Sequence, residues 1–309
     1  MQEKKNKRLF VLLIVLLVSI TAVYWVGREE QSFAPDKKLF NNYESELVDE
    51  VLLRSAADTV RLKYNGSRWL VNDQYQADRD MIRVFFATLE KAEPKRPVAS
   101  SMKDSISNAL EVNGVHVTLF TKSTQVANFI AGGNQPKTQS YFKAEDTNQP
   151  FVMAIPGYRV YVSGIFELNE SGWRDKHVFN LNWQNFSRLD ADFKNPEGNF
   201  TILMEDGAVK VKDVAIADTA RVNGFMDYIS LITVDDFVPG SRKLDSLSKT
   251  PPFVSFEITD IGGKNHLLTI FPGTGRQQFY GLINKSQWAV FQEDRILPLL
   301  RPKEFFIKR

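Results

Sequence analysis

Residues 59–78 read TVRLKYNGSRWLVNDQYQAD, and this stretch decides the fold of the chain. Thr59–Tyr64 alternates polar and apolar side chains, as a half-buried strand does. The dipeptide Asn65-Gly66 follows, which is typical of a tight β-hairpin, and Arg68–Val71 supplies the returning strand. Asp78 then stands where the N-cap of a helix is expected. The stretch therefore predicts a hairpin that leads into a helix.

The neighbouring residues extend this unit on both sides. Upstream, Val48–Arg54 predicts a strand that precedes the hairpin. Downstream, apolar residues recur at helical spacing until Pro94 and Pro97 end the helix, and Ser105–Leu110 predicts a second, short helix. The apolar helix positions are Met81, Ile82, Phe85, Phe86 and Leu89.

A run of short strands follows the helices. Each is apolar in alternation and is separated from the next by Ser, Asn, Gly or Pro, so an antiparallel meander is expected. Tyr158–Leu168 continues as strand or as helix. The four strands are Val115–Thr121, Ala127–Gly132, Gln139–Lys143 and Phe151–Ile155.

The chain then repeats itself. Ala77-Asp78 is echoed 140 residues later by Ala217-Asp218, and Phe85 and Leu89 are echoed by Phe225 and Ile229 at the same offset. Asp206-Gly207 takes the place of the first hairpin turn, and a second meander follows. Two copies of one unit of about 130 to 140 residues are the simplest account. The later meander strands are Phe253–Thr259, His266–Phe271, Gln278–Leu282 and Trp288–Phe291.

These patterns predict an α+β protein with an N-terminal transmembrane helix and two tandem related β-rich units. Each unit has the order β-β-β-α followed by an antiparallel strand meander. Whether the units form one body or two domains is left open. The expected parts are a basic tail at 1–8, a membrane span at 9–27, a stalk at 28–43, a first unit at 44–168, an aromatic connector at 169–183 and a second unit at 184–309.

Leu9–Gly27 (LFVLLIVLLVSITAVYWVG) carries no charge, and its length of about 28 Å matches the hydrocarbon core of a bilayer. Basic residues precede it, which predicts a cytoplasmic N-terminus and an exported C-terminal region, with the lipid bilayer as a partner of Leu9–Gly27. A cleaved signal peptide is the alternative. Tyr24 and Trp25 argue against cleavage, because they stand where small residues are needed.

The composition removes several classes of function. The chain has no cysteine, so disulfides, thiolate metal sites and lipid attachment to cysteine are excluded. The net charge is +2, and no basic stripe interleaved with aromatic residues indicates nucleic-acid binding.

No catalytic, cofactor-binding or metal-binding residue is predicted from the sequence. His116, His177 and His266 are scattered singly. Asp190 and Asp192 would share one face of a strand, where a solvated face is favoured over a cation site. Gly132-Gly133 and Gly262-Gly263 fail the phosphate-loop pattern and are better explained by hairpin turns that need positive φ.

Four aromatic residues stand around the join between the two units. Tyr158, Tyr161, Trp173 and Trp183 are consistent with a ligand platform, but core packing at a junction is favoured.

Four features of the chain occur together: the N-terminal anchor, Tyr64–Leu70 (YNGSRWL), Tyr75–Asp78 (YQAD) and Tyr141-Phe142. In these features the chain resembles the bacterial DUF4340 family. It covers most of the chain after the anchor and departs at Ala109–Gly114, where the family has a strong Gly-Leu pair. It implies a membrane-anchored domain of unknown function, often encoded beside ABC-type transporter components, including those related to gliding motility. The family brings no catalytic residues to carry over.

We therefore expect a single-pass protein of the bacterial cytoplasmic (inner) membrane that acts as a non-enzymatic accessory of a transporter or gliding-related assembly. Membrane or envelope proteins are its expected partners, and no cofactor is expected. The alternative is an envelope enzyme that acts on glycan or peptide with carboxylates in a cleft between the units. Its candidate residues are Asp190, Asp192, Asp235 and Asp236. Glycosidase chemistry would require two carboxyl groups roughly 5 to 9.5 Å apart.

Overall fold

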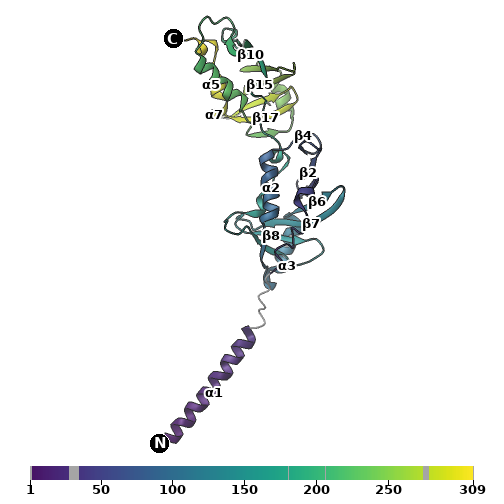
Figure 1. The fold of residues 1–309 in the computed structure, drawn as a ribbon, viewed down its shortest axis with the longest axis vertical. Helices are drawn as coiled ribbons and strands as arrows, with labels where there is room; N and C mark the ends of the chain where they lie inside the picture. The colour runs from purple at the N-terminus through teal and green to yellow at the C-terminus, as the bar shows by residue number, and fades with distance from the viewer. Residues whose placement is uncertain (1, 28–34, 180, 206, 274–277, 309) are drawn as a thin grey trace. The chain divides into compact units, whose positions relative to one another are not determined.

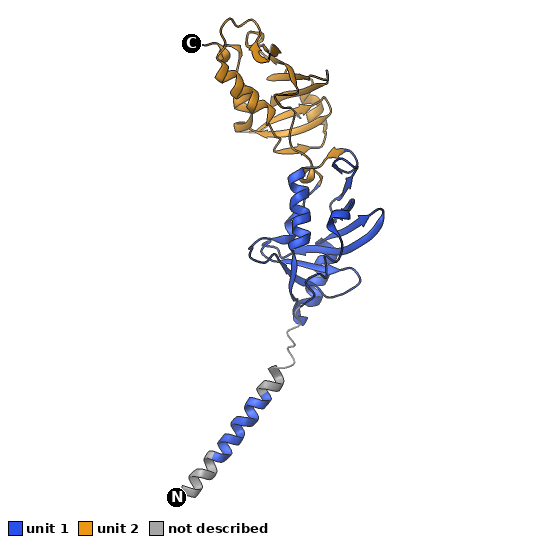
Figure 2. Ribbon diagram, viewed as in Figure 1, with its two compact units in different colours: residues 1–74, 79–169 blue, residues 75–78, 170–309 orange. Residues whose placement is uncertain are grey.

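The computed structural model describes residues 2–27, 35–179, 181–205, 207–273 and 278–308, and the side chains of its first helix only from Phe10 to Ala22. The predicted α+β class is confirmed, because an N-terminal helix and two large antiparallel sheets make up the fold (Figure 1). The chain divides into two compact units (Figure 2). The first comprises residues 1–74 and 79–169, and the second comprises residues 75–78 and 170–309.

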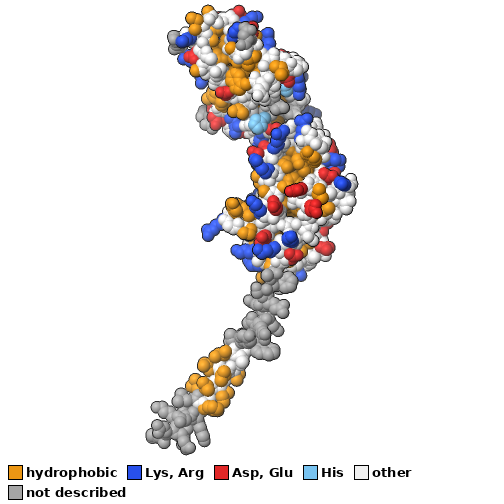
Figure 3. Space-filling view, in the orientation of Figure 1, with side chains coloured by type: hydrophobic (Ala, Val, Ile, Leu, Met, Phe, Trp, Pro, Cys, Tyr) orange, Lys and Arg blue, Asp and Glu red, His pale blue; other side chains and the backbone are white. Residues whose placement is uncertain are grey.

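The first helix, α1, runs from Gln2 to Gly27. Its large apolar side chains between Phe10 and Ile20 are 46% to 65% exposed, and Figure 3 shows them as an uncovered hydrophobic stretch. In the part of the chain that the structure describes, no helix has both the length and the apolarity of a membrane span. The side chains of Leu9 and of residues 23–27, which belong to the predicted span, lie outside the described residues, as do residues 28–34 of the predicted stalk.

The predicted hairpin is present in the first unit. Strand β2 (Thr59–Tyr64) pairs with β3 (Trp69–Val71), and the Asn65 side chain accepts hydrogen bonds from the backbone of Ser67 at 3.1 Å and of Arg68 at 3.0 Å. Gly66 has φ +91°, a conformation that side chains with a Cβ rarely adopt. The side-chain cap of Asn65 and the freedom of Gly66 together explain why this dipeptide turns the chain.

After its hairpin, the first unit contains helices α2 and α3 and a strand between them that was not predicted. Helix α2 (Arg79–Lys91) begins after Asp78 as predicted, whereas α3 (Ser100–Asn113) is longer than the expected Ser105–Leu110. The prolines after α2 do not simply end an element, because Glu93–Pro97 forms strand β5. Strand β5 lies at the edge of the sheet and pairs with one strand only. A proline, which lacks a backbone N–H, is acceptable there because its nitrogen can face away from the paired strand.

The meander of the first unit is confirmed, and its strands complete a sheet in the order β4-β3-β2-β1-β6-β7-β8-β9-β5. Residues 155–168, for which strand or helix was open, contain only the short 3-10 helix η2 (Val162–Ile165). The other strands of this sheet are β1 (Glu50–Arg54), β4 (Tyr75–Gln76), β6 (Val115–Thr121), β7 (Thr124–Gly133), β8 (Ser140–Ala144) and β9 (Phe151–Ala154).

The sheet of the second unit has the order β12-β11-β10-β14-β15-β16-β17-β13. Apart from β4 at one edge of the first sheet, the two orders correspond strand for strand. Gly207 has φ +74° at the turn between β11 and β12, and Asp206 of that predicted turn lies outside the described residues. The strands are β10 (Phe186–Phe193), β11 (Phe200–Glu205), β12 (Ala208–Val211), β13 (Asp236–Val238), β14 (Val254–Asp260), β15 (Asn265–Pro272), β16 (Gln278–Ile283) and β17 (Gln287–Gln292).

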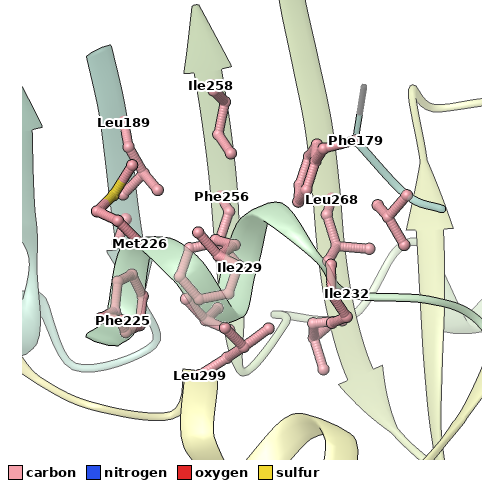
Figure 4. Packing of buried hydrophobic residues seen from close by; sticks show 14 of the residues in the cluster. Phe179, Leu189, Phe225, Met226, Ile229, Ile232, Phe256, Ile258, Leu268 and Leu299 are labelled. Atoms are coloured by element: carbon pink, nitrogen blue, oxygen red, sulfur yellow. The ribbon is translucent and has the colours of Figure 1, made fainter. Parts of the chain in front are cut away.

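Helix α5 (Thr219–Ser230) covers this second sheet. Its residues Phe225 and Ile229 are buried against Leu189 of β10 and Phe256 of β14 (Figure 4). The positions that the repeat equated, Phe85 with Phe225 and Leu89 with Ile229, are thus core positions in both units. The remaining short elements of this unit are η3 (Pro196–Gly198), α4 (Glu170–Trp173), α6 (Arg242–Leu247), α7 (Glu293–Ile296), η4 (Leu297–Leu299) and η5 (Lys303–Phe306).

Candidate functional site

An apolar groove of about 570 Å³ lies in the first unit, between α2 and the segment that follows β9. One wall is a single face of α2, and the other is the irregular segment 155–168. Its volume falls within the roughly 300–1,000 Å³ of small-molecule sites. The α2 wall consists of Met81, Val84, Ala87, Thr88 and Lys91, and the opposite wall includes Ile155, Tyr158, Val160, Tyr161, Ile165 and Leu168.

The helix wall exists because α2 is apolar on more than one face. Ile82, Phe85 and Leu89 are buried in the core. Met81 and Val84 lie on a different face, and Val84 remains 45% exposed. An ordinary surface helix presents polar residues there, since only its core stripe needs to be apolar. The exposed apolar face is therefore available for contact with another molecule.

The opposite wall, residues 155–168, is anchored to the core by a buried aromatic side chain. Phe166 is buried and packs edge-on against Phe85 with ring centroids 5.5 Å apart. Gly157, with φ +81°, turns the chain so that Tyr158 and Val160 stand out from the surface. A Cβ at Gly133 would lie 2.3 Å from the Tyr161 ring, so this glycine makes room for the wall.

The prediction of a hairpin turn at Gly132-Gly133 is wrong, because both residues lie within β7 and neither has positive φ. Close packing of Tyr161 accounts for Gly133 instead. Gly263 does adopt positive φ, at +76°, in the turn between β14 and β15.

The polar group that Tyr161 brings to the groove is paired. The hydroxyl of Tyr161 donates a hydrogen bond to Glu167, whose carboxylate also pairs with Lys137 at 2.9 Å. Burial, and then the Glu167 carboxylate, raise the pKa of the Tyr161 phenol, so it stays protonated at neutral pH. Lys91 has no ion-pair partner among the described residues. The groove therefore offers apolar contact and one unpaired cation.

Two of the four aromatic residues singled out in the sequence belong to this groove. Tyr158 and Tyr161 line it, whereas Trp173 is fully buried in the second unit. Trp183, also in the second unit, is 41% exposed and donates through Nε1 to Asp227 at 2.8 Å. The outer face of α2 was not predicted, because Met81 fits the same helical spacing as the core residues.

A family model described as "Domain of unknown function (DUF4340)" matches residues 69–250, which is more than half of the chain. The chain belongs to the DUF4340 family. The match covers α2 and the whole groove. No curated protein and no solved structure matches this DUF4340 protein.

The four candidate carboxylates of this DUF4340 protein are not brought together. Asp190 and Asp192 lie on β10, while Asp235 and Asp236 lie at the start of β13, and four strands separate β10 from β13 in the sheet. Asp190 accepts two hydrogen bonds from Arg188, at 2.5 and 2.6 Å, and Asp235 pairs with Arg295 at 3.1 Å. The Arg188 guanidinium holds the pKa of Asp190 below its usual value.

The three histidines lie in separate places. Each has a carboxylate within 4 Å, and the described residues contain no group of three His, Asp or Glu that could hold a metal ion. The pairs are His116 with Glu145 at 2.8 Å, His177 with Asp175 at 2.7 Å and His266 with Asp260 at 3.6 Å.

Proposed function

We propose that this DUF4340 protein is a non-enzymatic, single-pass protein of the bacterial cytoplasmic membrane. Its exported region would bind an apolar ligand as an accessory of an ABC-type transporter or a gliding-related assembly. The observation that carries the binding role is the apolar groove beside α2. Groove walls of aliphatic and aromatic side chains favour recognition by burial of apolar surface, which needs no catalytic group.

Residues 9–27 would be the membrane anchor. Nineteen residues without a charge suit the hydrocarbon core, and basic residues before them favour a cytoplasmic N-terminus. The Ser19 hydroxyl donates to the Val15 carbonyl and the Thr21 hydroxyl to the Leu17 carbonyl, each at 2.7 Å. Such pairing within the helix suits a medium that offers no hydrogen bonds. The uncovered apolar side chains of α1 also support this role.

We further propose that the two units are copies of one ancestral unit. The corresponding strand orders support this, as do two matching contacts of the segments that precede the main helices. Ala77 forms an isolated bridge with Arg174, and Ala217 forms one with Ile307. If the units are copies, a feature present in one and changed in the other marks a specialised surface.

The assembly role is tested by purifying the tagged full-length protein from native membranes after crosslinking. We expect the membrane subunits of an ABC-type transporter to be recovered with the wild type. Val84→Glu should reduce that recovery, because a carboxylate in the groove opposes apolar binding. Val112→Glu is the matched control, since Val112 is an exposed valine of α3 in the same unit, 67% exposed.

Two results would contradict the proposal. One is repeated recovery without any transporter or envelope protein. The other is a mature protein that begins after Gly27 and leaves the membrane fraction without detergent.

A further inference from the structure

The apolar face of α2 has polar counterparts in the second unit. At the offset of 140 residues that equates Phe85 with Phe225, Met81 corresponds to Arg221 and Ala87 to Asp227. Val84 corresponds to Gly224. The core positions of the two helices have remained apolar, whereas these outer positions differ in character. The apolar face is therefore not required by the fold that the units share.

A second difference leaves space beside α2. Thr88 stands at the groove, and its counterpart in the second unit is Tyr228. The Tyr228 hydroxyl donates to the carbonyl of Arg295 at 3.1 Å, so this side chain spans from α5 to the segment after β17. A threonine is too short to span in this way.

The two units also differ in the path that the chain takes after the last strand of the meander. In the second unit, β17 continues directly into α7 at Glu293. In the first unit, residues 155–161 separate β9 from η2, and this added segment carries the exposed side chains of Tyr158 and Val160. The first unit thus has an extra apolar wall opposite its apolar helix face.

We infer that this groove binds the hydrocarbon chain of a long-chain fatty acid, with the carboxylate at Lys91. The inference rests on the proposed function, in which the groove is the binding element, and names its ligand. A volume of about 570 Å³ lies within the range of sites that hold one small amphiphile. The walls supply apolar contact along the chain, and Lys91 supplies a cation for the head group.

The charges near the groove favour an anionic head. Lys91 is the charged side chain among the lining residues, and it has no ion-pair partner among the described residues. The lining residues include no carboxylate, and Glu167, which precedes the lining residue Leu168, is already paired with Tyr161 and Lys137. An anionic head group would therefore find Lys91, whereas a cationic head group would find no carboxylate in the lining.

The first test maps the site by photo-crosslinking. The full-length protein is placed in nanodiscs of phosphatidylcholine and irradiated with a photoactivatable palmitate, and labelled peptides are identified by mass spectrometry. We expect labelled peptides from α2 and residues 155–168. Val84→Glu should lower this labelling by about tenfold or more, because the hydrocarbon chain would have to desolvate a carboxylate in order to bind. Val112→Glu should leave it unchanged.

The second test addresses the head group. Dodecanoate should compete with the label, whereas dodecyltrimethylammonium, which has the same chain and a cationic head, should not. Lys91→Glu should weaken labelling by about fivefold, as expected for loss of an exposed ion pair. Lys249→Glu is the control, since Lys249 is an exposed lysine of the second unit.

Several outcomes would overturn the inference. These are labelling confined to α1, labelling of the groove that Val84→Glu leaves intact, and equal competition by the two dodecyl compounds. Groove labelling by a photoactivatable phospholipid of the nanodisc but not by palmitate would assign the groove to a membrane lipid instead.

The crosslinking tests separate this inference from the proposed function. If palmitate fails to label the groove while Val84→Glu still reduces recovery of the transporter, only the fatty-acid inference is lost. If palmitate labels the groove and recovery of the transporter does not depend on Val84, the accessory role is lost and the fatty-acid site stands.

Discussion

The guanidinium carbon of Arg174 lies 3.6 Å from the centre of the Tyr75 ring and equally close to the centre of the Phe237 ring. Arg174 is 7% exposed, and its guanidinium also pairs with Glu170 at 3.5 Å. Burial lowers the pKa of the guanidinium, which nevertheless stays charged at neutral pH. Through this contact the segment 75–78, which precedes α2 in the chain, is packed into the second unit.

Replacing this arginine should destabilise the second unit. We expect Arg174→Ala to lower the free energy of unfolding by about 2 to 4 kcal/mol, since it removes a desolvated cation between two rings and leaves a cavity. Arg174→Lys should recover only part of this, because an ammonium group cannot stack as a plane. Denaturant unfolding of the full-length protein measures both. A change below about 0.5 kcal/mol for the alanine variant would show that the stacking contributes little.

Two glycines should respond to alanine in opposite directions. Gly66 has φ +91°, so Gly66→Ala should destabilise the protein by about 1 kcal/mol. Gly224 lies inside α5, where an added Cβ meets no atom within 4 Å, so Gly224→Ala should stabilise by about 0.5 to 1 kcal/mol. The unfolding temperatures of the two variants and of the wild type measure these changes. Shifts of the same sign would contradict this account.

Replacing Glu111 should cost more stability than replacing its ion-pair partner Lys143. The Lys143 side chain is buried, whereas about half of the Glu111 side chain is exposed. Glu111→Ala would leave a buried ammonium without its partner, and we expect a loss of about 2 to 3 kcal/mol. Lys143→Met, which keeps the volume and removes the charge, should cost less than about 1 kcal/mol. Urea titrations would contradict the account if the methionine variant proved the less stable of the two.

Asp190 should contribute to the acid sensitivity of the protein. Arg188, and then Thr201, hold the pKa of Asp190 below its unfolded value. Its stabilising effect is therefore complete above about pH 4 and is lost as the pH falls through the folded pKa. Because the Asp190 side chain is 30% exposed and that of Arg188 is 46% exposed, the contribution should be only about 0.5 to 1 kcal/mol.

This contribution is measured by unfolding the wild type and Asp190→Asn between pH 6 and pH 2. The difference in stability between the two should shrink on acidification. Asp192→Asn is a control, because the hydrogen bond that its carboxylate accepts among the described residues comes from the uncharged amide of Asn199, at 3.2 Å. A difference that is constant with pH would contradict the assignment.

The parts of the fold that could be predicted are those with local signals. The Asn65-Gly66 turn, the start of α2 after Asp78 and the meander strands depend on residues close in sequence, so pattern and propensity suffice. Strand β5 was missed because Pro94 and Pro97 are poor strand residues. Only its position at the edge of the sheet, which is a long-range property, makes them acceptable.

The groove could be predicted only in part. The sequence singled out Tyr158 and Tyr161, since clustered aromatic residues are visible in any sequence. The helix wall could not be recognised, because Met81 fits the same apolar periodicity as the core residues Ile82 and Phe85. Whether an apolar residue faces the core or a groove depends on what packs opposite, and residues 155–168 are far away in sequence.

The most direct measurement for the central claim, that the groove of the first unit is a binding site, is methyl NMR of the full-length protein in nanodiscs. Dodecanoate is titrated while the signals of Val84, Ile155 and Ile165 are followed, with Val112 as an internal control. The account predicts saturable shifts of the three groove residues and an unchanged Val112. Shifts confined to α1, or equal shifts of all four residues, would contradict it.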